Sequence, residues 1–302
     1  MRITVVGCGA IGTLLASKLA SVGLSVQVFQ RPGATLDRIR SVGVALWDGE
    51  TAPCPVRAED DPSRLDRSDI AIVTVKAFST DEVAPVLPEL LLPDGAVLTV
   101  QNGLGNGEKL SQVLGGVNVA VGACTYGAYR DDRGEVHLGG LGEIVFGPVE
   151  RGRDWRPLED ALNRSGLSAR AVDDPAPVLW GKLAVNAAIN PVAALIRREN
   201  GCVLSSDGLA DLCRSLAMEA CSVARSVGVS LDSQVMWDRV RAVVRSTSKN
   251  TCSMLQDVLA GRPTEIEAIS GEILRLGEID GISLPATETV YRLVKGLESK
   301  VV

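Results

Sequence analysis

The stretch from Ile3 to Gly12 decides the fold, and it reads Ile-Thr-Val-Val-Gly-Cys-Gly-Ala-Ile-Gly. A short β-rich run ends there in glycine, and from Ile11 to Val22 apolar residues recur at helical spacing. A second β-rich run, Val26–Phe29, follows closely. A glycine-rich turn that joins a strand to a helix, with another strand soon after, is the context in which the GxGxxG pattern binds a dinucleotide.

Each glycine of this motif has a separate physical task. Gly7 allows the tight turn, Gly9 lets the backbone approach a pyrophosphate, and Gly12 lets the helix pack close to the strand. The N–H groups and the dipole at the helix start then favour a phosphate charge. The predicted cofactor-binding residues of the motif are Gly7, Cys8, Gly9, Ala10, Ile11 and Gly12. A tight turn without a ligand is the alternative.

The end of the second strand distinguishes between the two nicotinamide cofactors. NAD sites usually place Asp or Glu there to bind the ribose 2′-hydroxyl. This chain has Gln30 and Arg31 at that point and no carboxylate. Because a guanidinium can bind a phosphate through two parallel hydrogen bonds, Arg31 favours NADP(H). The alternative is a solvated surface arginine.

The rest of the chain predicts two domains. Further strands are expected at 69–75, 96–100 and 117–121, separated by helices, and this alternation predicts a parallel sheet covered on both faces. Residues 135–138 and 143–146 flank a glycine-rich turn and predict an antiparallel hairpin at the edge. We therefore expect an α/β, Rossmann-type domain over 1–172 and an all-α domain over 173–302.

The second domain is expected to be helical throughout. The predicted helices are 177–197, 204–227, 232–246, 253–260, 265–280 and 286–299. Thr264 and Glu267 have the spacing of a capping box, in which the Thr264 side chain and the Glu267 side chain each bind a free backbone N–H. Helices in the 204–227 or 265–299 region have apolar stripes beyond the needs of one small domain, and they predict a homodimer.

Composition excludes several classes of function. The chain has 302 residues, 46% of them apolar, and a net charge of −6, which argues against a nucleic-acid or anionic-membrane surface. Its seven cysteines form no CxxC pair, as expected for reduced thiols in the cytoplasm and not for a disulfide framework or a metal site. No apolar run of 18 residues predicts a membrane span. We expect a cytoplasmic protein without a metal.

A polar stripe interrupts the apolar segment Trp180–Pro191. Lys182, Asn186 and Asn190 lie four residues apart, so a helix places them on one face. Because burial of unpaired polar groups is costly, they must be solvated or satisfied in a cleft. A desolvated lysine ammonium can polarise a carbonyl and donate a proton, which makes Lys182 a candidate general acid. A surface stripe is the alternative.

This segment resembles the K-x-x-x-N-x-x-x-N-P signature of the ketopantoate reductase family. The glycine motif and Arg31 resemble the family's cofactor site, and the resemblance extends over nearly the whole chain. Its other pieces are Thr74–Ala77, Gln101–Gly105, Asn200–Gly201, Asn250–Asp257 and Arg262–Ile266. Small departures are Cys202 and Cys252, where relatives often carry Glu and Ser.

The resemblance implies reduction of 2-dehydropantoate (ketopantoate) to D-pantoate, a step of pantothenate biosynthesis, by hydride transfer from NADPH. Lys182 would be the general acid and Glu265 its partner, although a carboxylate in a first helical turn is also favoured by the helix dipole. The implied further cofactor ligands are Lys76 and Asn102, and the implied substrate ligands are Asn102, Asn186, Asn190, Asn200, Asn250 and Ser253. The single histidine, His137, lies away from these motifs, so a histidine acid is not expected.

Two other functions are compatible with the same residues. The first is a reductase or dehydrogenase of another 2-keto acid and D-2-hydroxy acid pair, which would share the lysine and the glycines. The second is a non-catalytic NADP-binding module, which would have no need of a proton donor. Asn186, Asn190 and Ser253 favour a substrate that bears a hydroxyl group, as ketopantoate does.

Overall fold

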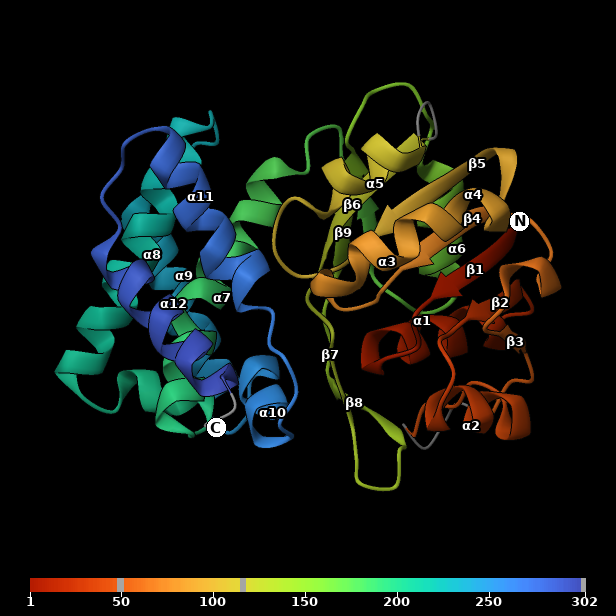
Figure 1. Ribbon diagram of the computed structural model, residues 1–302, viewed down its shortest axis with the longest axis horizontal. Helices are drawn as coiled ribbons and strands as arrows, with labels where there is room; N and C mark the ends of the chain where they lie inside the picture. Colours follow the sequence, from red (N-terminus) through yellow and green to blue (C-terminus); the bar gives the residue numbers. More distant parts are fainter. Residues whose placement is uncertain (48–51, 115–117, 300–302) are drawn as a thin grey trace. The chain divides into compact units, whose positions relative to one another are not determined.

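A computed structural model describes residues 1–47, 52–114 and 118–299 of the chain. The chain divides into two compact units, which Figure 1 draws in the colours of the sequence. Unit 1 comprises Met1–Gln101 and Asn106–Pro175, and unit 2 comprises Asn102–Gly105 and Ala176–Val302. The loop Asn102–Gly105, which a division at residue 172 would assign to the first domain, therefore packs with the helical unit.

Unit 1 contains, within the described residues, an eight-stranded sheet in the order β10-β9-β6-β5-β4-β1-β2-β3. The strands are β1 Arg2–Val6, β2 Ser25–Phe29, β3 Arg57–Glu59, β4 Ser68–Val73, β5 Leu91–Thr99, β6 Asn118–Cys124, β9 Ile144–Pro148 and β10 Ala169–Ala171. β9 runs antiparallel to β6, β10 runs parallel to β9, and the other neighbours pair in parallel. The predicted fold class is confirmed. Val117, the first residue of one expected strand, lies outside the described residues.

Alternate residues of the central strands enter two different cores. Ile72 of β4 belongs to the cluster that contains Leu15 of α1 (Ala10–Ser21), whereas its neighbour Val73 belongs to the cluster that contains Leu110 of α5 (Asn106–Leu114). The sheet is therefore buried on both faces, which is why its strands are nearly continuous apolar runs. The remaining helices of unit 1 are α2 Ala34–Val42, α3 Thr80–Val83, α4 Leu87–Leu90 and α6 Arg156–Arg164, with short 3₁₀ turns at Pro62–Arg64, Ala77–Ser79 and Ala84–Val86.

The expected hairpin of 135–138 with 143–146 is wrong. β8 (Val136–Gly140) pairs with β7 (Gly127–Arg130) in a separate two-stranded sheet, while β9 joins the main sheet between β6 and β10. Gly142 lies where the chain passes between the two sheets, and a Cβ there would lie 2.3 Å from the Tyr126 nitrogen. Burial decides the pairing, because β9 is almost fully buried whereas β8 is mostly accessible. Burial of the apolar strand β9 in the main sheet stabilises the fold more than a local hairpin with β8 would.

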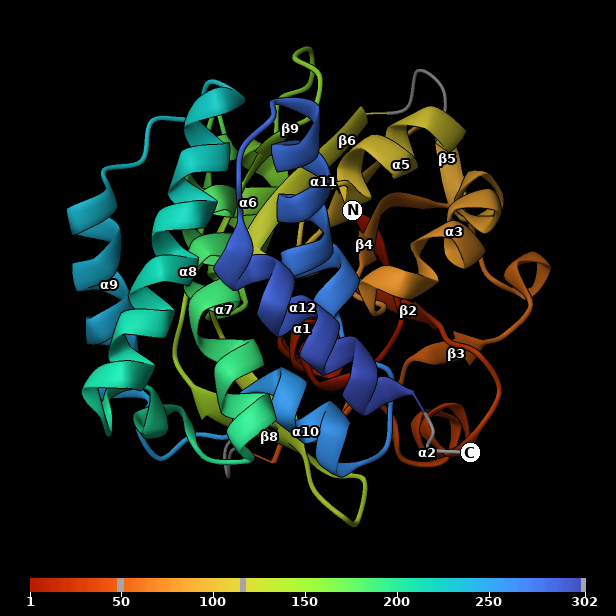
Figure 2. The same ribbon diagram turned by 60° about the vertical axis from the view of Figure 1, so that its left-hand side comes forward.

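Unit 2 is built around one long apolar helix, α7 (Ala176–Ile196), which contacts α8, α9, α10 and α12 (Figure 2). The other helices are α8 Asp207–Ser226, α9 Ser233–Ser246, α10 Ser253–Leu259, α11 Glu272–Ile279 and α12 Pro285–Glu298, with a 3₁₀ turn at Asn200–Leu204 and a π turn at Glu267–Gly271. Among the described residues, α7 is the helix whose length and composition would suffice to cross a membrane, and 72% of its apolar window is buried inside the protein. A helix buried on nearly all sides needs this apolar composition in a protein core.

The expected capping box is half wrong. Thr264 does accept a hydrogen bond from the Ile266 N–H at 3.2 Å, as an N-cap residue should. Glu267 does not return the bond, because its carboxylate accepts from the Tyr291 hydroxyl at 2.9 Å and lies 3.4 Å from Lys295 of α12. The Thr264 N–H donates instead to Glu298 Oε1 at 2.7 Å. A residue 34 positions away in the sequence therefore supplies the cap.

Candidate active site

The glycine motif forms the tight turn between β1 and α1 that its spacing predicts. Gly7 has a φ of +88°, and a Cβ on it would lie 2.4 Å from Val75 Cγ1. A Cβ on Gly12 would lie 2.0 Å from the Gly7 carbonyl oxygen, so the helix could not approach the strand. A Cβ on Gly9, in contrast, would meet no atom within 4 Å. The open side at Gly9 therefore faces the space in which a ligand could approach the backbone.

The residues after β2 form the second part of this region. Arg31 lies two residues beyond the end of β2 and is exposed, and no carboxylate stands beside it in the sequence. Gln30 occupies the position at which NAD sites carry an acid, and its Oε1 accepts a hydrogen bond from the Cys8 N–H at 2.7 Å. Gln30 therefore ties the glycine loop to the end of β2 and leaves the guanidinium of Arg31 accessible to an anion.

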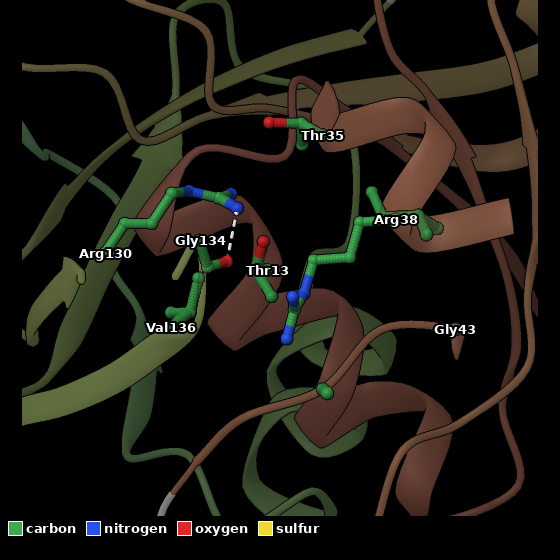
Figure 3. A pocket seen from close by; sticks show the side chains of 9 residues that line it. Thr13, Thr35, Arg38, Gly43, Arg130, Gly134 and Val136 are labelled. Carbon is green, nitrogen blue, oxygen red and sulfur yellow. Dashed lines mark hydrogen bonds between the residues drawn. The ribbon is translucent and has the colours of Figure 1, made fainter. Parts of the chain in front are cut away.

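Two further residues bind the carbonyl oxygens of the glycine loop. The Thr74 hydroxyl donates to the Gly7 carbonyl oxygen, and Arg130 Nη2 donates to the Cys8 carbonyl oxygen at 2.8 Å. Burial, followed by the nearby Arg38, lowers the pKa of Arg130. Figure 3 shows Arg130 and Arg38 on either side of Thr13 in a small hollow of unit 1. Lys76, half-buried, lies just beyond the end of β4 and immediately before the short turn Ala77–Ser79.

In unit 2, the predicted polar stripe is the accessible line of a buried helix. From Trp180 to Ala194 every residue of α7 is buried except Lys182 and Asn186. Asn190, one turn further, is 7% exposed. Of the three residues in the predicted stripe, Lys182 and Asn186 are therefore accessible, and we call these two side chains the accessible line. The apolar residues of α7 belong to the core of unit 2.

The loop Asn102–Gly105 brings a second pair of predicted residues together. Asn102 Nδ2 donates to Glu265 Oε2 at 2.9 Å, although the two residues are 163 positions apart in the sequence. The Glu265 residue is only 6% exposed. A buried carboxylate requires hydrogen bonds of this kind, because its desolvation is otherwise costly.

Two family models match the two parts of the chain. The family model described as "Ketopantoate reductase PanE/ApbA" matches residues 3–151, and "Ketopantoate reductase PanE/ApbA C terminal" matches residues 176–298. The chain belongs to the ketopantoate reductase family. It is thus an oxidoreductase of a family that depends on pyridine nucleotides.

Relatives of this family member extend over its whole length. It is 35% identical to the 2-dehydropantoate 2-reductase of Archaeoglobus fulgidus over 99% of this chain and 98% of that protein. With the 2-dehydropantoate 2-reductase of Vibrio cholerae it shares 31% identity over 99% and 98% of the two chains. The solved ketopantoate reductase of Ralstonia eutropha superposes with a TM-score of 0.90 at 27% identity, covering 99% of this chain and 98% of that one. D-mandelate dehydrogenase has the same fold, with a TM-score of 0.92 at 23% identity and coverage of 99% and 98%.

Three of the residues implied by the resemblance to ketopantoate reductases lie around the start of α10. Asn250 and Ser253 are exposed. Asn200 is buried, its Nδ2 donates to Thr247 Oγ1 at 3.0 Å, and its backbone N–H donates to the Asn250 carbonyl oxygen at 3.0 Å. Asn200 therefore holds the loop that carries Asn250, and its own side chain is turned away from solvent.

The departure at Cys252 has a structural explanation. Its Sγ accepts from the Leu255 N–H at 3.4 Å, so Cys252 is the N-cap of α10. The same thiol donates to the Asn190 carbonyl oxygen at 3.7 Å and thereby links α10 to the end of the polar stripe. Burial raises the pKa of this thiol to about 11, which keeps it protonated at neutral pH.

Sequence reasoning missed Gln30, Thr74 and Arg130 as residues that hold the glycine loop. Gln30 could have been found from its position at the end of β2, whereas nothing in the sequence marks Arg130. His137 hydrogen-bonds to Asp131 at 3.0 Å and stacks on Tyr129. These contacts give His137 a structural task in the β7–β8 sheet.

Proposed function

We propose that this chain reduces 2-dehydropantoate to D-pantoate with NADPH. The observation that carries the proposal is the accessible line of Lys182 and Asn186 on an otherwise buried helix. Full-length relatives named 2-dehydropantoate 2-reductase support the choice of substrate.

The glycine loop is suited to a dinucleotide. Gly9 leaves open the space that a pyrophosphate would need, and the start of α1 offers backbone N–H groups and a positive dipole end. Arg31, exposed and without a neighbouring carboxylate in the sequence, would bind the 2′-phosphate and thus select NADP(H). The motif residues, Lys76 and Asn102 would hold the rest of the cofactor.

The chemistry needs one proton and one anchored substrate. NADPH, when bound, supplies a hydride to the 2-carbonyl carbon of the keto acid. As the C=O double bond becomes a single bond, the oxygen takes a proton from Lys182 Nζ, and the product is an alcohol. Asn186 and Asn190 would bind the substrate's hydroxyl and carbonyl end, and Asn102, Asn250 and Ser253 its carboxylate and remainder, because amides and hydroxyls both donate and accept. Glu265 would hold Lys182 and the substrate in place.

The experiment follows NADPH absorbance with ketopantoate, in parallel with other 2-keto acids. Faster turnover of ketopantoate than of the others, lost in Lys182→Ala without loss of NADPH binding, supports both the substrate and the proton donor. Faster turnover of a different keto acid would keep the mechanism and reject the substrate. Tight NADPH binding without turnover of any keto acid would favour a non-catalytic role.

We also propose a homodimer in the cytoplasm. Leu293 and Leu297 lie one turn apart on α12 and are 53% and 42% exposed, an apolar surface that a second copy could cover. The seven cysteines, all within the described residues, are not joined in disulfides, which suits a reducing compartment. Light scattering that gives the mass of a single chain at micromolar protein would contradict the dimer.

A further inference from the structure

The loop Asn102–Gly105 is fastened to the segment that carries Glu265. The Leu104 N–H donates to the Ala268 carbonyl oxygen at 3.2 Å, and the Leu104 side chain packs against the core of unit 2. The Asn102 amide, two residues earlier, donates to the Glu265 carboxylate. One backbone bond and one side-chain bond therefore hold the loop to a single stretch of four residues.

Gly103 lies where the loop and this stretch come closest. Its φ is +87°, and a Cβ on it would lie 2.3 Å from the Ala268 carbonyl oxygen and 2.6 Å from Ala268 Cβ. Gly105, in the same loop, has a similar φ of +81°, but a Cβ there would be 3.7 Å from its nearest neighbour, Glu272 Oε1. The two glycines thus share a backbone conformation, and only Gly103 is also required by a close approach.

Ala268 belongs to the π turn Glu267–Gly271, in which the Glu272 N–H donates to the Glu267 carbonyl oxygen five residues earlier. Such single π turns are rare and often occur at functional sites. Here the turn begins two residues after Glu265, and its Ala268 carbonyl oxygen accepts a hydrogen bond from the Leu104 N–H of the loop. Any displacement at Gly103 would move the adjacent Asn102, whose bond to Glu265 is 2.9 Å long.

We propose that Gly103 and Ala268 are positioning residues that set the distance between the Asn102 amide and the Glu265 carboxylate. The inference rests on the proposed function, because that function places these two side chains at the substrate. Their contact acts as a spacer: the backbone of Gly103 rests against Ala268, and no side chain can be inserted between them.

The test compares Gly103→Ala with Gly105→Ala, which adds the same methyl group at the same backbone conformation without the close contact. Gly103→Ala should lower kcat/KM for ketopantoate by about 10–100-fold, the effect of a displacement of roughly 1 Å in a catalytic group. Gly105→Ala should stay within about twofold of wild type. Ala268→Val crowds the contact from the other side without straining residue 103, and it should lower kcat/KM in the same way even if Gly103→Ala does not fold.

A double-mutant cycle separates positioning from general destabilisation. If Gly103 acts through Asn102, then Gly103→Ala should cause no further loss of kcat/KM in an Asn102→Ala background. Losses that multiply would overturn the inference, as would wild-type activity in both Gly103→Ala and Ala268→Val. A wild-type enzyme without turnover would instead overturn the proposed function, and this inference with it, so the two failures are distinguishable.

Discussion

The glycine loop of unit 1 and the accessible line of unit 2 expose different groups of the chain to a ligand. The loop offers backbone where side chains are missing, and all its key positions lie within residues 7–12. The accessible line offers the side chains of Lys182 and Asn186 on a buried helix. The hydrogen-bonded pair Asn102 and Glu265, also in unit 2, comes from distant parts of the sequence. A backbone site therefore fails when a side chain is added, whereas a side-chain site fails when a group is removed or displaced.

The largest effect should come from removing a group from the side-chain site. Lys182→Ala should lower kcat by about 10²–10⁴-fold, the usual contribution of a positioned general acid. The Kd for NADPH should change little, because the glycine loop is intact. Lys109→Ala, which removes an exposed lysine paired with Asp81 at 2.8 Å, is the control and should retain full activity. Steady-state kinetics would contradict the role of Lys182 if both variants behaved alike.

A substitution of Arg31 tests whether this one charge makes the chain prefer NADPH to NADH. Arg31→Ala should weaken NADPH binding by about 10–100-fold, since a hydrogen bond to a charged group contributes about 1.5–3 kcal/mol. NADH has no 2′-phosphate, so its Kd should not move. Fluorescence titration with both nucleotides gives the comparison. Equal losses for NADPH and NADH would mean that Arg31 does not select the cofactor.

Within the glycine loop, stability and affinity should separate. Gly12→Ala drives a methyl group against the Gly7 carbonyl and should lower the free energy of unfolding by about 1–3 kcal/mol, as overpacking does. Gly9→Ala has room for its Cβ and should keep the stability of wild type while it weakens NADPH binding. Chemical denaturation and nucleotide titration measure the two effects. A stable Gly12→Ala would show that the loop is less tightly packed than these contacts indicate.

Glu298 tests the cap that replaced the expected capping box. Glu298→Ala removes the acceptor of the Thr264 N–H and should cost about 1 kcal/mol of stability, as the loss of an N-terminal cap usually does. Glu288→Ala, on the same helix, removes an exposed pair with Arg292 and should cost less than about 0.5 kcal/mol. The outcome that contradicts the cap is an equal change in the two urea midpoints.

The last prediction concerns the pH dependence of stability. Burial raises the pKa of the Cys252 thiol from 9.0 to about 11. Its contribution to stability is therefore full below about pH 9 and is lost as the pH rises toward 11, where the unfolded chain releases the proton first. Cys252→Ser keeps an N-cap oxygen and should lose less stability than wild type between pH 9 and pH 11. Parallel pH dependences of the two proteins would show that Cys252 does not titrate in this range.

What the sequence determined by itself is local. The glycine motif, the strands of the parallel sheet and the helices of unit 2 follow from spacing of a few residues, and steric limits and apolar periodicity act at that range. The accessible line of α7 could also be predicted from the sequence, because helical geometry places Lys182 and Asn186 on one face.

Tertiary structure decided the rest, because competing partners lie far apart in the sequence. β8 and β9 flank one turn and could have formed a hairpin. Because β9 is the more apolar strand, it is buried in the main sheet instead, and β8 pairs with β7. Glu267 had the spacing of a cap, yet Tyr291 and Lys295 bind it and Glu298 takes its place. The bond between Asn102 and Glu265 depends on a loop that packs with unit 2 although it interrupts the sequence of unit 1. Local patterns state which groups need partners, and only the packed chain selects among the partners available.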